Sequence, residues 1–272
     1  MGYNSNIFLL MPKYDADALA FINATGLTDA TQRNAINYLV INLKSIGVWT
    51  KLYALYPFVG GTATTHKYNL KNPVDSNAAF RLTFNGTVTH DANGVTFALA
   101  NGYANSYLSP SSTFTANNES LFLYSRTSTA TAGTNDIDMG AASTPTVRDQ
   151  LQIRTSDDNS VTSINSTSDG TGTVKATNTN GEGFFVGSRI SSTDLRLFKN
   201  GSQIGSTATT TNNGVRTSLN VYIGARNVSN SPNGFTGRNF ALAGMSKGLT
   251  TTEVSDMYTV VQQYQTLLSR QV

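Results

Sequence analysis

Apolar side chains recur every three or four residues in two stretches of the chain, and this spacing predicts two helices. The first helix can be capped by Thr28 or Asp29 and ends at Gly47, and its apolar side recurs at Ile36, Leu39, Val40, Leu43 and Ile46. The second starts with a capping box of Thr250 and Glu253, followed by an apolar face of Val254, Met257, Tyr258, Val261, Tyr264 and Leu268. A shorter helix is expected over residues 15–23.

Between these helices, apolar and polar residues alternate in short runs separated by Asn, Gly and Ser. The runs predict strands over residues 79–84, 95–99, 120–124, 151–154, 183–188, 195–199, 202–205, 219–224 and 240–244. Within LRLFKNGSQIGS, the pair Asn200-Gly201 predicts a hairpin with a type I′ turn, because both central residues of that turn need a positive φ. Many short strands with such turns predict a β-sandwich or a barrel.

Composition narrows the classes of partner that the chain can have. Among 272 residues there is no cysteine, so disulfides and thiolate metal sites are excluded. Charged residues make up 13% and the net charge is +3, with no Lys/Arg cluster that would indicate nucleic-acid binding. The apolar run Ile7–Met11 is too short for a signal peptide, and no run reaches the length of a membrane span. We therefore expect no nucleic acid, no membrane insertion and no cleaved signal.

The order of motifs in residues 180–265 resembles concanavalin A-like (LamG-type) jelly-roll domains. The matching motifs are Asn200-Gly201, Ile223-Gly224, Phe235, Gly237, Leu249-Thr250, Glu253 and Tyr258. This resemblance implies a mainly β fold: a concanavalin A-like jelly-roll β-sandwich with an N-terminal helical segment and a C-terminal helix. We expect residues 1–61 to form the helical attachment segment and residues 62–272 the sandwich with its closing helix. This resemblance is informative about the fold and says little about function.

Three further stretches resemble virion proteins of tailed phages, namely YPFVGG at 56–61, HKYNLKNP at 66–73 and TVVQQYQTLLSRQV at the end. The resemblance implies a structural virion protein at the tail, fibre or capsid surface, folded in the host cytoplasm. Its partners would be other virion proteins, copies of itself and cell-surface glycans. The alternative is a carbohydrate-binding lectin module outside any particle. The helices could pack on their own sandwich or on a neighbouring subunit, and the pattern does not separate these possibilities.

Carboxylates give little support for catalysis, and we expect no enzyme activity. Glycosidases need two carboxyl groups on either side of the scissile bond, but Glu119, Glu182 and Glu253 are scattered singly along the chain. Only aspartates brought together by the fold could replace the missing pair. No catalytic residue is therefore predicted.

The strongest candidate for a metal is the pair Asp136 and Asp138, two residues apart and so on one side of a strand. With Asn135 and backbone carbonyls they could hold Ca²⁺, which prefers six to eight oxygen ligands. The surrounding Gly, Ala and Thr residues favour a solvated loop instead. We expect no cofactor, with Ca²⁺ as the alternative.

A candidate glycan-binding loop interleaves aromatic and amide side chains at Tyr103, Asn105 and Tyr107. Aromatic rings stack on the apolar faces of sugars, and amides bind their hydroxyl groups. The simpler alternative is a strand edge with one buried tyrosine. His66 and His90 are each expected to be surface or hydrogen-bonded residues, and Trp49 is expected to fill the junction between helix and sandwich.

Overall fold

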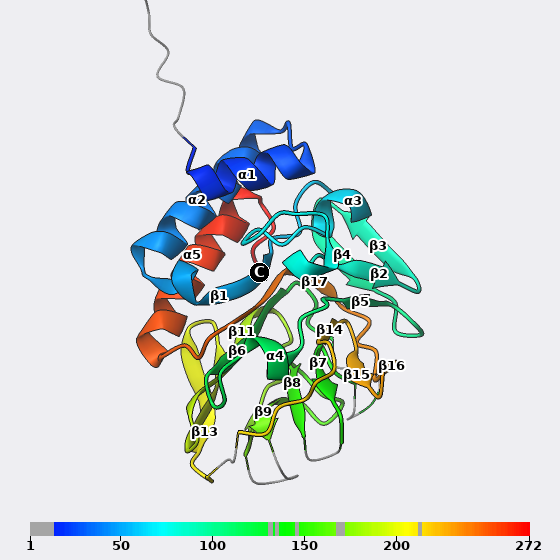
Figure 1. Cartoon of the computed structure of the whole chain (residues 1–272), viewed down its shortest axis with the longest axis vertical. Coiled ribbons are helices and arrows are strands. Elements are labelled where there is room, and N and C mark those ends of the chain that lie inside the picture. The colour runs from blue at the N-terminus through cyan, green and yellow to red at the C-terminus, as the bar shows by residue number, and fades with distance from the viewer. Residues whose placement is uncertain (1–13, 130–132, 134–135, 145–146, 167–171, 212–213) are drawn as a thin grey trace, which may run out of the picture.

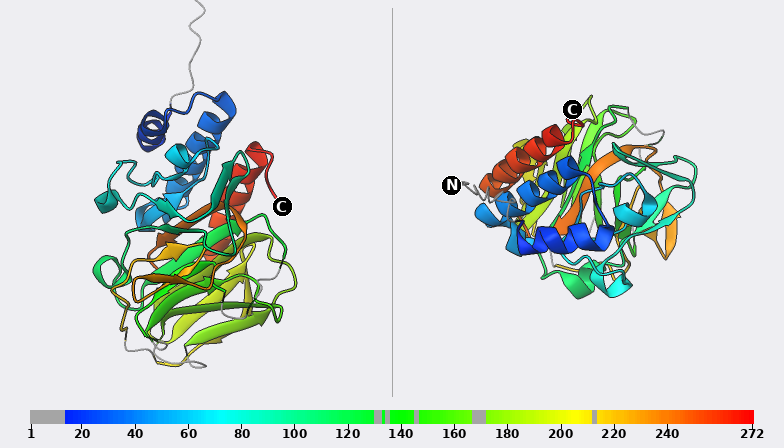
Figure 2. Two further views of the ribbon diagram at one scale, coloured as in Figure 1. Left: turned by 90° about the vertical axis from the view of Figure 1, so that its right-hand side faces the viewer. Right: turned by 90° about the horizontal axis from the view of Figure 1, so that it is seen from above.

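The computed structural model describes residues 14–129, 133, 136–144, 147–166, 172–211 and 214–272. These residues form three layers: a group of helices, an eight-stranded sheet A and a nine-stranded sheet B (Figures 1 and 2). The predicted fold class is confirmed: the chain is a mainly β jelly-roll sandwich with helices from both ends of the chain.

Sheet A lies in the middle and has the strand order β13-β12-β11-β6-β17-β4-β3, with β1 also paired to β17. Its strands are antiparallel, and β6 lies between β11 and β17, which are far from each other in the sequence. The strands are β1 (Leu52–Tyr56), β3 (Val88–Asp91), β4 (Gly94–Phe97), β6 (Glu119–Ser125), β11 (Gly183–Ser191), β12 (Asp194–Lys199), β13 (Ser202–Ala208) and β17 (Asn239–Ser246).

Sheet B has the order β10-β9-β8-β7-β14-β5-β2, and a small hairpin of β15 and β16 joins it through β7. The pairing of β15 with β7 is parallel, and the pairings along the rest of the sheet are antiparallel. The strands are β2 (Thr83–Asn85), β5 (Tyr103–Asn105), β7 (Met139–Ala142), β8 (Arg148–Gln152), β9 (Asn159–Ser166), β10 (Thr173–Thr177), β14 (Tyr222–Ile223), β15 (Arg226–Val228) and β16 (Ser231–Asn233).

The central strands of sheet A are buried on both faces, as the sequence of strand β6 shows. Alternate side chains of a strand point to opposite faces of the sheet. All residues of β6 are buried, because both faces are covered at this strand. Leu121 and Leu123 join the core between the two sheets, whereas Phe122 and Tyr124 join the cluster beneath the helices. The sandwich therefore has two hydrophobic layers, one on each side of sheet A.

Helices α2 and α5 begin at the predicted caps, and α2 ends at Ser45, two residues before the predicted Gly47. Helix α1 (Ala16–Thr25) is capped by Asp15, and α2 (Ala30–Ser45) by Asp29, whose carboxylate accepts from the backbone N–H of Gln32. Helix α5 (Thr251–Leu267) starts with the predicted capping box of Thr250 and Glu253. Single-turn helices complete the set: η1 (Val48–Lys51), α3 (Ala63–His66), η2 (Asn77–Ala79) and α4 (Pro110–Thr113). Within the described residues, no helix combines the length and apolar character needed to cross a membrane.

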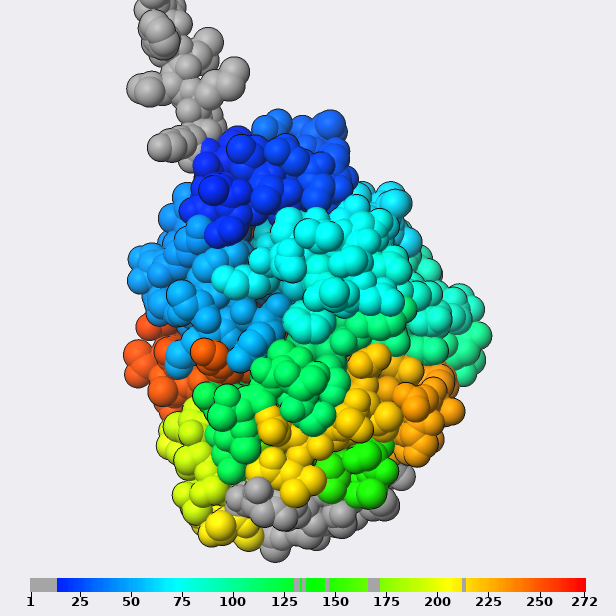
Figure 3. Space-filling view, viewed as in Figure 1, coloured from blue at the N-terminus to red at the C-terminus, as the bar shows by residue number. Residues whose placement is uncertain are grey.

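The helices pack on their own sandwich, which answers the question that the sequence left open. Apolar residues of α1, α2 and α5 share one cluster with Phe122, Tyr124 and Phe184 of sheet A. Trp49 lies in this cluster, 5% exposed, with Nζ of Lys71 4.3 Å from its ring centre, so the predicted role at the junction is confirmed. Figure 3 shows the N-terminal helices above the segment around residues 60–90 on one face of the molecule.

Strand boundaries are the part of the prediction that needs correction. The expected strand over residues 79–84 is instead the helical turn η2 followed by β2, which starts only at Thr83. Phe80 separates them with φ of 59°, in the left-handed region, so the chain cannot be extended there. The Asn200-Gly201 hairpin is confirmed, since both residues have positive φ, 49° and 78°, between β12 and β13.

Candidate functional site

The three candidate glycan-binding residues lie on and beside β5, at the outer face of sheet B. Ala104 points into the core between the sheets, so the alternation of the strand places Tyr103 and Asn105 on the opposite face, where both are half-buried. Helices α1, α2 and α5 pack on sheet A, so this outer face is not covered by them. The residues predicted from the sequence are therefore at a surface that can meet a ligand.

Tyr103 belongs to an aromatic cluster built by three segments of the chain. Its ring stacks on that of Tyr222 in β14, with ring centres 4.7 Å apart and planes at 29°. The ring centre of Phe235 lies 6.4 Å from that of Tyr103. Offset stacking of this kind fixes the orientation of the rings. The half-buried rings of Tyr103 and Phe235 thus form a rigid apolar surface.

Asn105 holds Tyr107 in place beside this cluster. The side-chain oxygen of Asn105 accepts a hydrogen bond from the backbone N–H of Tyr107 at 2.9 Å, and Tyr107 has φ of 56°. The phenol of Tyr107 donates to the hydroxyl of Thr83 in β2 at 3.0 Å. Burial raises the pKa of Tyr222, and the neighbouring Tyr103 and Tyr107 raise it further. Three phenols, an amide and a hydroxyl therefore gather on one patch, which we call the tyrosine patch.

A groove of about 350 Å³ adjoins the tyrosine patch through Thr83. One wall is formed by the turn of α3 and the other by the segment leading into β2, and the lining residues are Ala63, Thr64, Lys67, Arg81, Leu82, Thr83 and Phe84. Its mixture of apolar walls and a few polar groups is typical of small-ligand sites, although the volume is at the lower end of their range.

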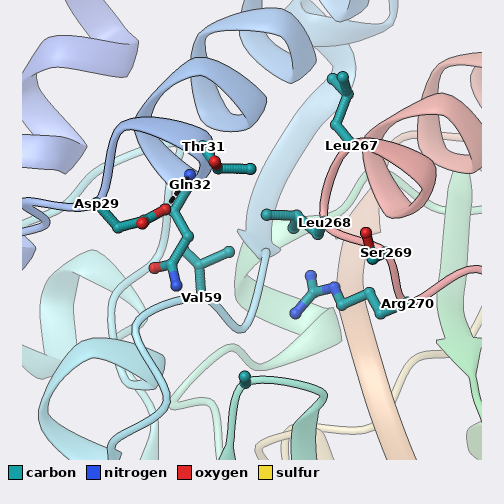
Figure 4. Close-up of a pocket in the computed structure, with 9 residues that line it drawn as sticks. Asp29, Thr31, Gln32, Val59, Leu267, Leu268, Ser269 and Arg270 are labelled. Carbon is teal, nitrogen blue, oxygen red and sulfur yellow. Dashed lines mark hydrogen bonds between the residues drawn. The ribbon is translucent and has the colours of Figure 1, made fainter.

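A second cavity, of about 210 Å³, lies between the start of α2 and the end of α5 (Figure 4). Arg270 lines it, but its guanidinium donates to the carbonyls of Pro57, Phe58 and Ala241 and to the side chain of Gln265. The carboxylate of Asp29 is occupied as the cap of α2. The charged groups here are already hydrogen-bonded within the protein, and the bonds of Arg270 connect the end of α5 to the sandwich. We therefore do not assign a ligand to this cavity.

Asp136 and Asp138, the candidate calcium ligands, have different surroundings. Asp138 is buried and pairs with the buried Arg238, with Oδ1 2.5 Å from Nη1, while its Oδ2 accepts from the backbone N–H of Ile153. The half-buried Asp136 accepts from the backbone N–H of Gly133 at 2.8 Å. Asn135 lies outside the described residues. A cation at Asp138 would have to displace the guanidinium of Arg238. In the part of the chain that the structure describes, no three His, Cys, Asp or Glu side chains gather as a metal site.

The fold assembles two titratable pairs that the sequence does not predict. His66 and His90 lie with their Nδ1 atoms 3.0 Å apart, so both are hydrogen-bonded. Glu119 of sheet A and Asp149 of sheet B both accept from Nδ2 of Asn165, each at 3.0 Å. Burial raises the pKa of Asp149 to about 6, and burial together with Asp149 raises that of Glu119. Both carboxyl groups are fully buried between the sheets, where a polysaccharide cannot reach them.

No protein-family model and no curated protein matches the chain. Among solved structures, a botulinum neurotoxin type C chain, whose cell entry depends on two ganglioside molecules, has a TM-score of 0.56 at 9% identity, covering 80% of this chain and 53% of that one. A mutant of HCR/D has a TM-score of 0.50 at 9% identity, with 78% and 52% covered. Domain 4 of an extracellular arabinanase from Geobacillus stearothermophilus, bound to arabinotriose, has a TM-score of 0.42 at 14% identity, with 76% and 98% covered.

The chain thus spans about half the length of the first two structures. At such low identities, what the two chains with the higher TM-scores share with this one is the fold. The similarity agrees with the jelly-roll architecture described above.

Proposed function

We propose that the chain is a carbohydrate-binding module that holds a glycan on the tyrosine patch. The observation that carries the proposal is the convergence of Tyr103, Asn105 and Tyr107 with Tyr222 and Thr83 on the outer face of sheet B. The half-buried rings offer apolar surface for the C–H face of a pyranose. The phenols, the amide and the hydroxyl offer donors and acceptors for its hydroxyl groups.

Preorganisation supports this role, since little order has to be gained on binding. Tyr103 is fixed by stacking, and Tyr107 is fixed at both its backbone and its phenol. A rigid aromatic surface loses less conformational entropy when a ligand binds than a flexible one does. The neurotoxin that shares the fold interacts with gangliosides, which makes complex glycans the first class to test.

The proposed activity is binding without bond cleavage. The one assembled carboxylate pair that we describe, Glu119 and Asp149, is buried between the sheets and away from the outer face. A place in a phage-like particle, with other virion proteins and copies of the chain as partners, stays a prediction. A glycan-binding surface would serve such a particle at its contact with the host, and it would equally serve an isolated lectin.

A glycan array followed by calorimetric titration tests the proposal. We expect saturable binding of at least one glycan, weakened about fivefold to tenfold in Tyr107→Ala. Tyr14→Ala is the control, because Tyr14 lies against α2 in the helical layer, where its phenol bonds to Asn34. The proposal is wrong if no glycan binds, or if both variants weaken binding alike while remaining folded.

A further inference from the structure

We propose that the groove beside the tyrosine patch binds the carboxylate of an acidic sugar through Lys67 and Arg81. This inference rests on the proposed glycan binding and adds the class of sugar. Both side chains line the groove, one from the residue that follows α3 and the other from the segment before β2. Thr83 lines it too and accepts from Tyr107, so one oligosaccharide can contact the groove and the tyrosine patch together.

The groove already shows how these two cations bind a carboxylate. Nζ of Lys67 lies 2.6 Å from Oδ2 of Asp75, and Nη1 of Arg81 lies 3.4 Å from Oδ1 of the same residue. The side chain of Asp75 is 46% exposed, whereas that of Lys67 is 18% exposed. The exposed partner is therefore the one that a ligand carboxylate can displace or accompany. Charge-assisted bonds of this kind are stronger than neutral ones and favour planar oxygen pairs.

Charge favours an anionic ligand over a neutral one. Two cations face one carboxylate, so the trio of Lys67, Arg81 and Asp75 leaves one positive charge uncompensated. The pKa of Asp75 lies below its ordinary value because of its hydrogen bond to Lys67 and the nearby charges of Lys67 and Arg81. The same potential favours the ionised form of any carboxylate that enters the groove.

The remaining walls suit the rest of a sugar ring. Phe84 is half-buried and packs edge-on against His90, with ring centres 4.4 Å apart, which fixes its orientation. Thr64 and Thr83 add hydroxyl groups. A carboxylate at the cations would thus leave the ring of the sugar against Phe84.

Paired sugars that differ in their carboxylate test this inference with the full chain. Lactose is compared with sialyllactose, and an oligomer of galactose with an oligomer of galacturonate of equal length. Both acidic sugars carry the same chemistry, so the two arms tell a sialic acid from a uronic acid. We expect at least one acidic member to bind about tenfold tighter than its neutral partner, and to lose this advantage at high salt.

Single-residue variants test whether the groove causes the preference for the acidic sugar. Arg81→Gln should remove the preference for the acidic sugar and leave the neutral one unchanged. Arg196→Gln is the matched control, since Arg196 is 30% exposed and paired with Asp194, much as Arg81 is 31% exposed and paired with Asp75. Asp75→Asn should act in the opposite direction and tighten the acidic sugar, because it removes the carboxylate that competes with the ligand for Lys67 and Arg81. A merely structural role of the trio would not produce this opposite sign.

The outcomes separate this inference from the function on which it rests. Equal binding of acidic and neutral sugars, or equal effects of Arg81→Gln and Arg196→Gln, would overturn the carboxylate site and leave glycan binding in place. If neither the paired sugars nor an array of glycans binds, the proposed function fails and this inference fails with it.

Discussion

At the scale of single residues, the hydrogen bond between His66 and His90 fixes the tautomer of both rings. Nε2 of His66 accepts from the backbone N–H of Gly61 at 3.2 Å, so the proton of this ring must be on Nδ1. That Nδ1 then donates to Nδ1 of His90, which places the proton of the second ring on its Nε2. Protonation of the acceptor nitrogen of either ring therefore breaks one of these bonds.

The buried histidine predicts a loss of stability in acid. Burial, His90 and Arg270 lower the pKa of His66 from its ordinary 6.5 to about 3. Below pH 6.5 the unfolded chain takes up a proton that the folded chain does not, so stability falls as the pH falls from 6.5 toward 3. The free energy of unfolding should be about 2 kcal/mol lower at pH 5 than at pH 7 from this residue. Urea unfolding of the wild type and His66→Gln at both values measures it, and equal changes in both proteins would contradict the prediction.

The buried carboxyl group of Asp149 predicts a dependence of the opposite sign. Its pKa is raised from 3.8 to about 6, so its contribution is fully present below pH 3.8 and is lost as the pH rises through 6. We expect Asp149→Asn to remove this loss, on the order of 3 kcal/mol, because the amide oxygen can still accept from Asn165. Urea unfolding at pH 4 and pH 7 measures the difference. Asp256→Asn on the exposed side of α5 is the control, and an unchanged slope in Asp149→Asn would refute the assignment.

The candidate site was only partly predictable at this scale. Tyr103, Asn105 and Tyr107 are visible in the sequence because they occupy alternate positions within five residues. Tyr222 and Thr83 could not be assigned to the same site, since they face Asn105 only through the register of β14 and β2. The same holds for Glu119 and Asp149, which come from different sheets. Contacts that depend on the order and register of strands can be identified only from the fold, because no local sequence pattern indicates them.

At the scale of elements, the hairpin of β12 and β13 also contacts helix α5. A Cβ atom added to Gly201 would lie 3.1 Å from the ring of Tyr258 and 3.3 Å from Cα of Ser255. The turn residue predicted from its positive φ thus lies directly against the closing helix. Two requirements meet at this glycine, a left-handed backbone and a close approach to α5.

Gly201→Ala and Gly47→Ala separate these two requirements. Gly47 has nearly the same φ, 77° against 78°, but an added Cβ would meet nothing within 4 Å. Gly47→Ala should cost about 1 kcal/mol from its backbone alone, and Gly201→Ala should cost about 1–3 kcal/mol more because side chains must move. Unfolding in urea measures both. Equal losses would mean that the contact with α5 carries no energy.

Local signals predicted the helices better than the strands. Caps at Asp29 and Thr250 fixed the helix starts because a cap is a bond between near neighbours in sequence. The strand expected over residues 79–84 is wrong because Phe80 takes a left-handed conformation that its sequence does not signal. Strand β1 was not predicted either, since its run of apolar residues reflects burial on both faces of sheet A.

At the scale of the whole molecule, the helical layer and the sandwich share one core. The cluster beneath the helices combines Leu39 and Val40 of α2 with Val260 and Val261 of α5 and with side chains of sheet A. Strand β1, which follows the first helices, pairs with β17 along Tyr56 to Leu52. Residues before position 61 and residues after it therefore both contribute to the helical layer and to sheet A.

This shared core predicts that residues 62–272 will not fold as a separate sandwich. Without residues 1–61, one edge of β17 loses the partner strand β1, and the cluster beneath the helices loses Phe21 of α1 and Leu39 and Val40 of α2. Exposed apolar sheet surface of this extent favours aggregation. The full chain should unfold in one transition that far-UV and near-UV circular dichroism report together. The fragment should lack a near-UV signal and elute as aggregates in size-exclusion chromatography.

A monomeric fragment that unfolds cooperatively would instead support the division at residue 61 that the sequence predicts. Glycan binding by such a fragment would then show that the tyrosine patch needs the sandwich alone, and the helices would be free to serve as an attachment segment.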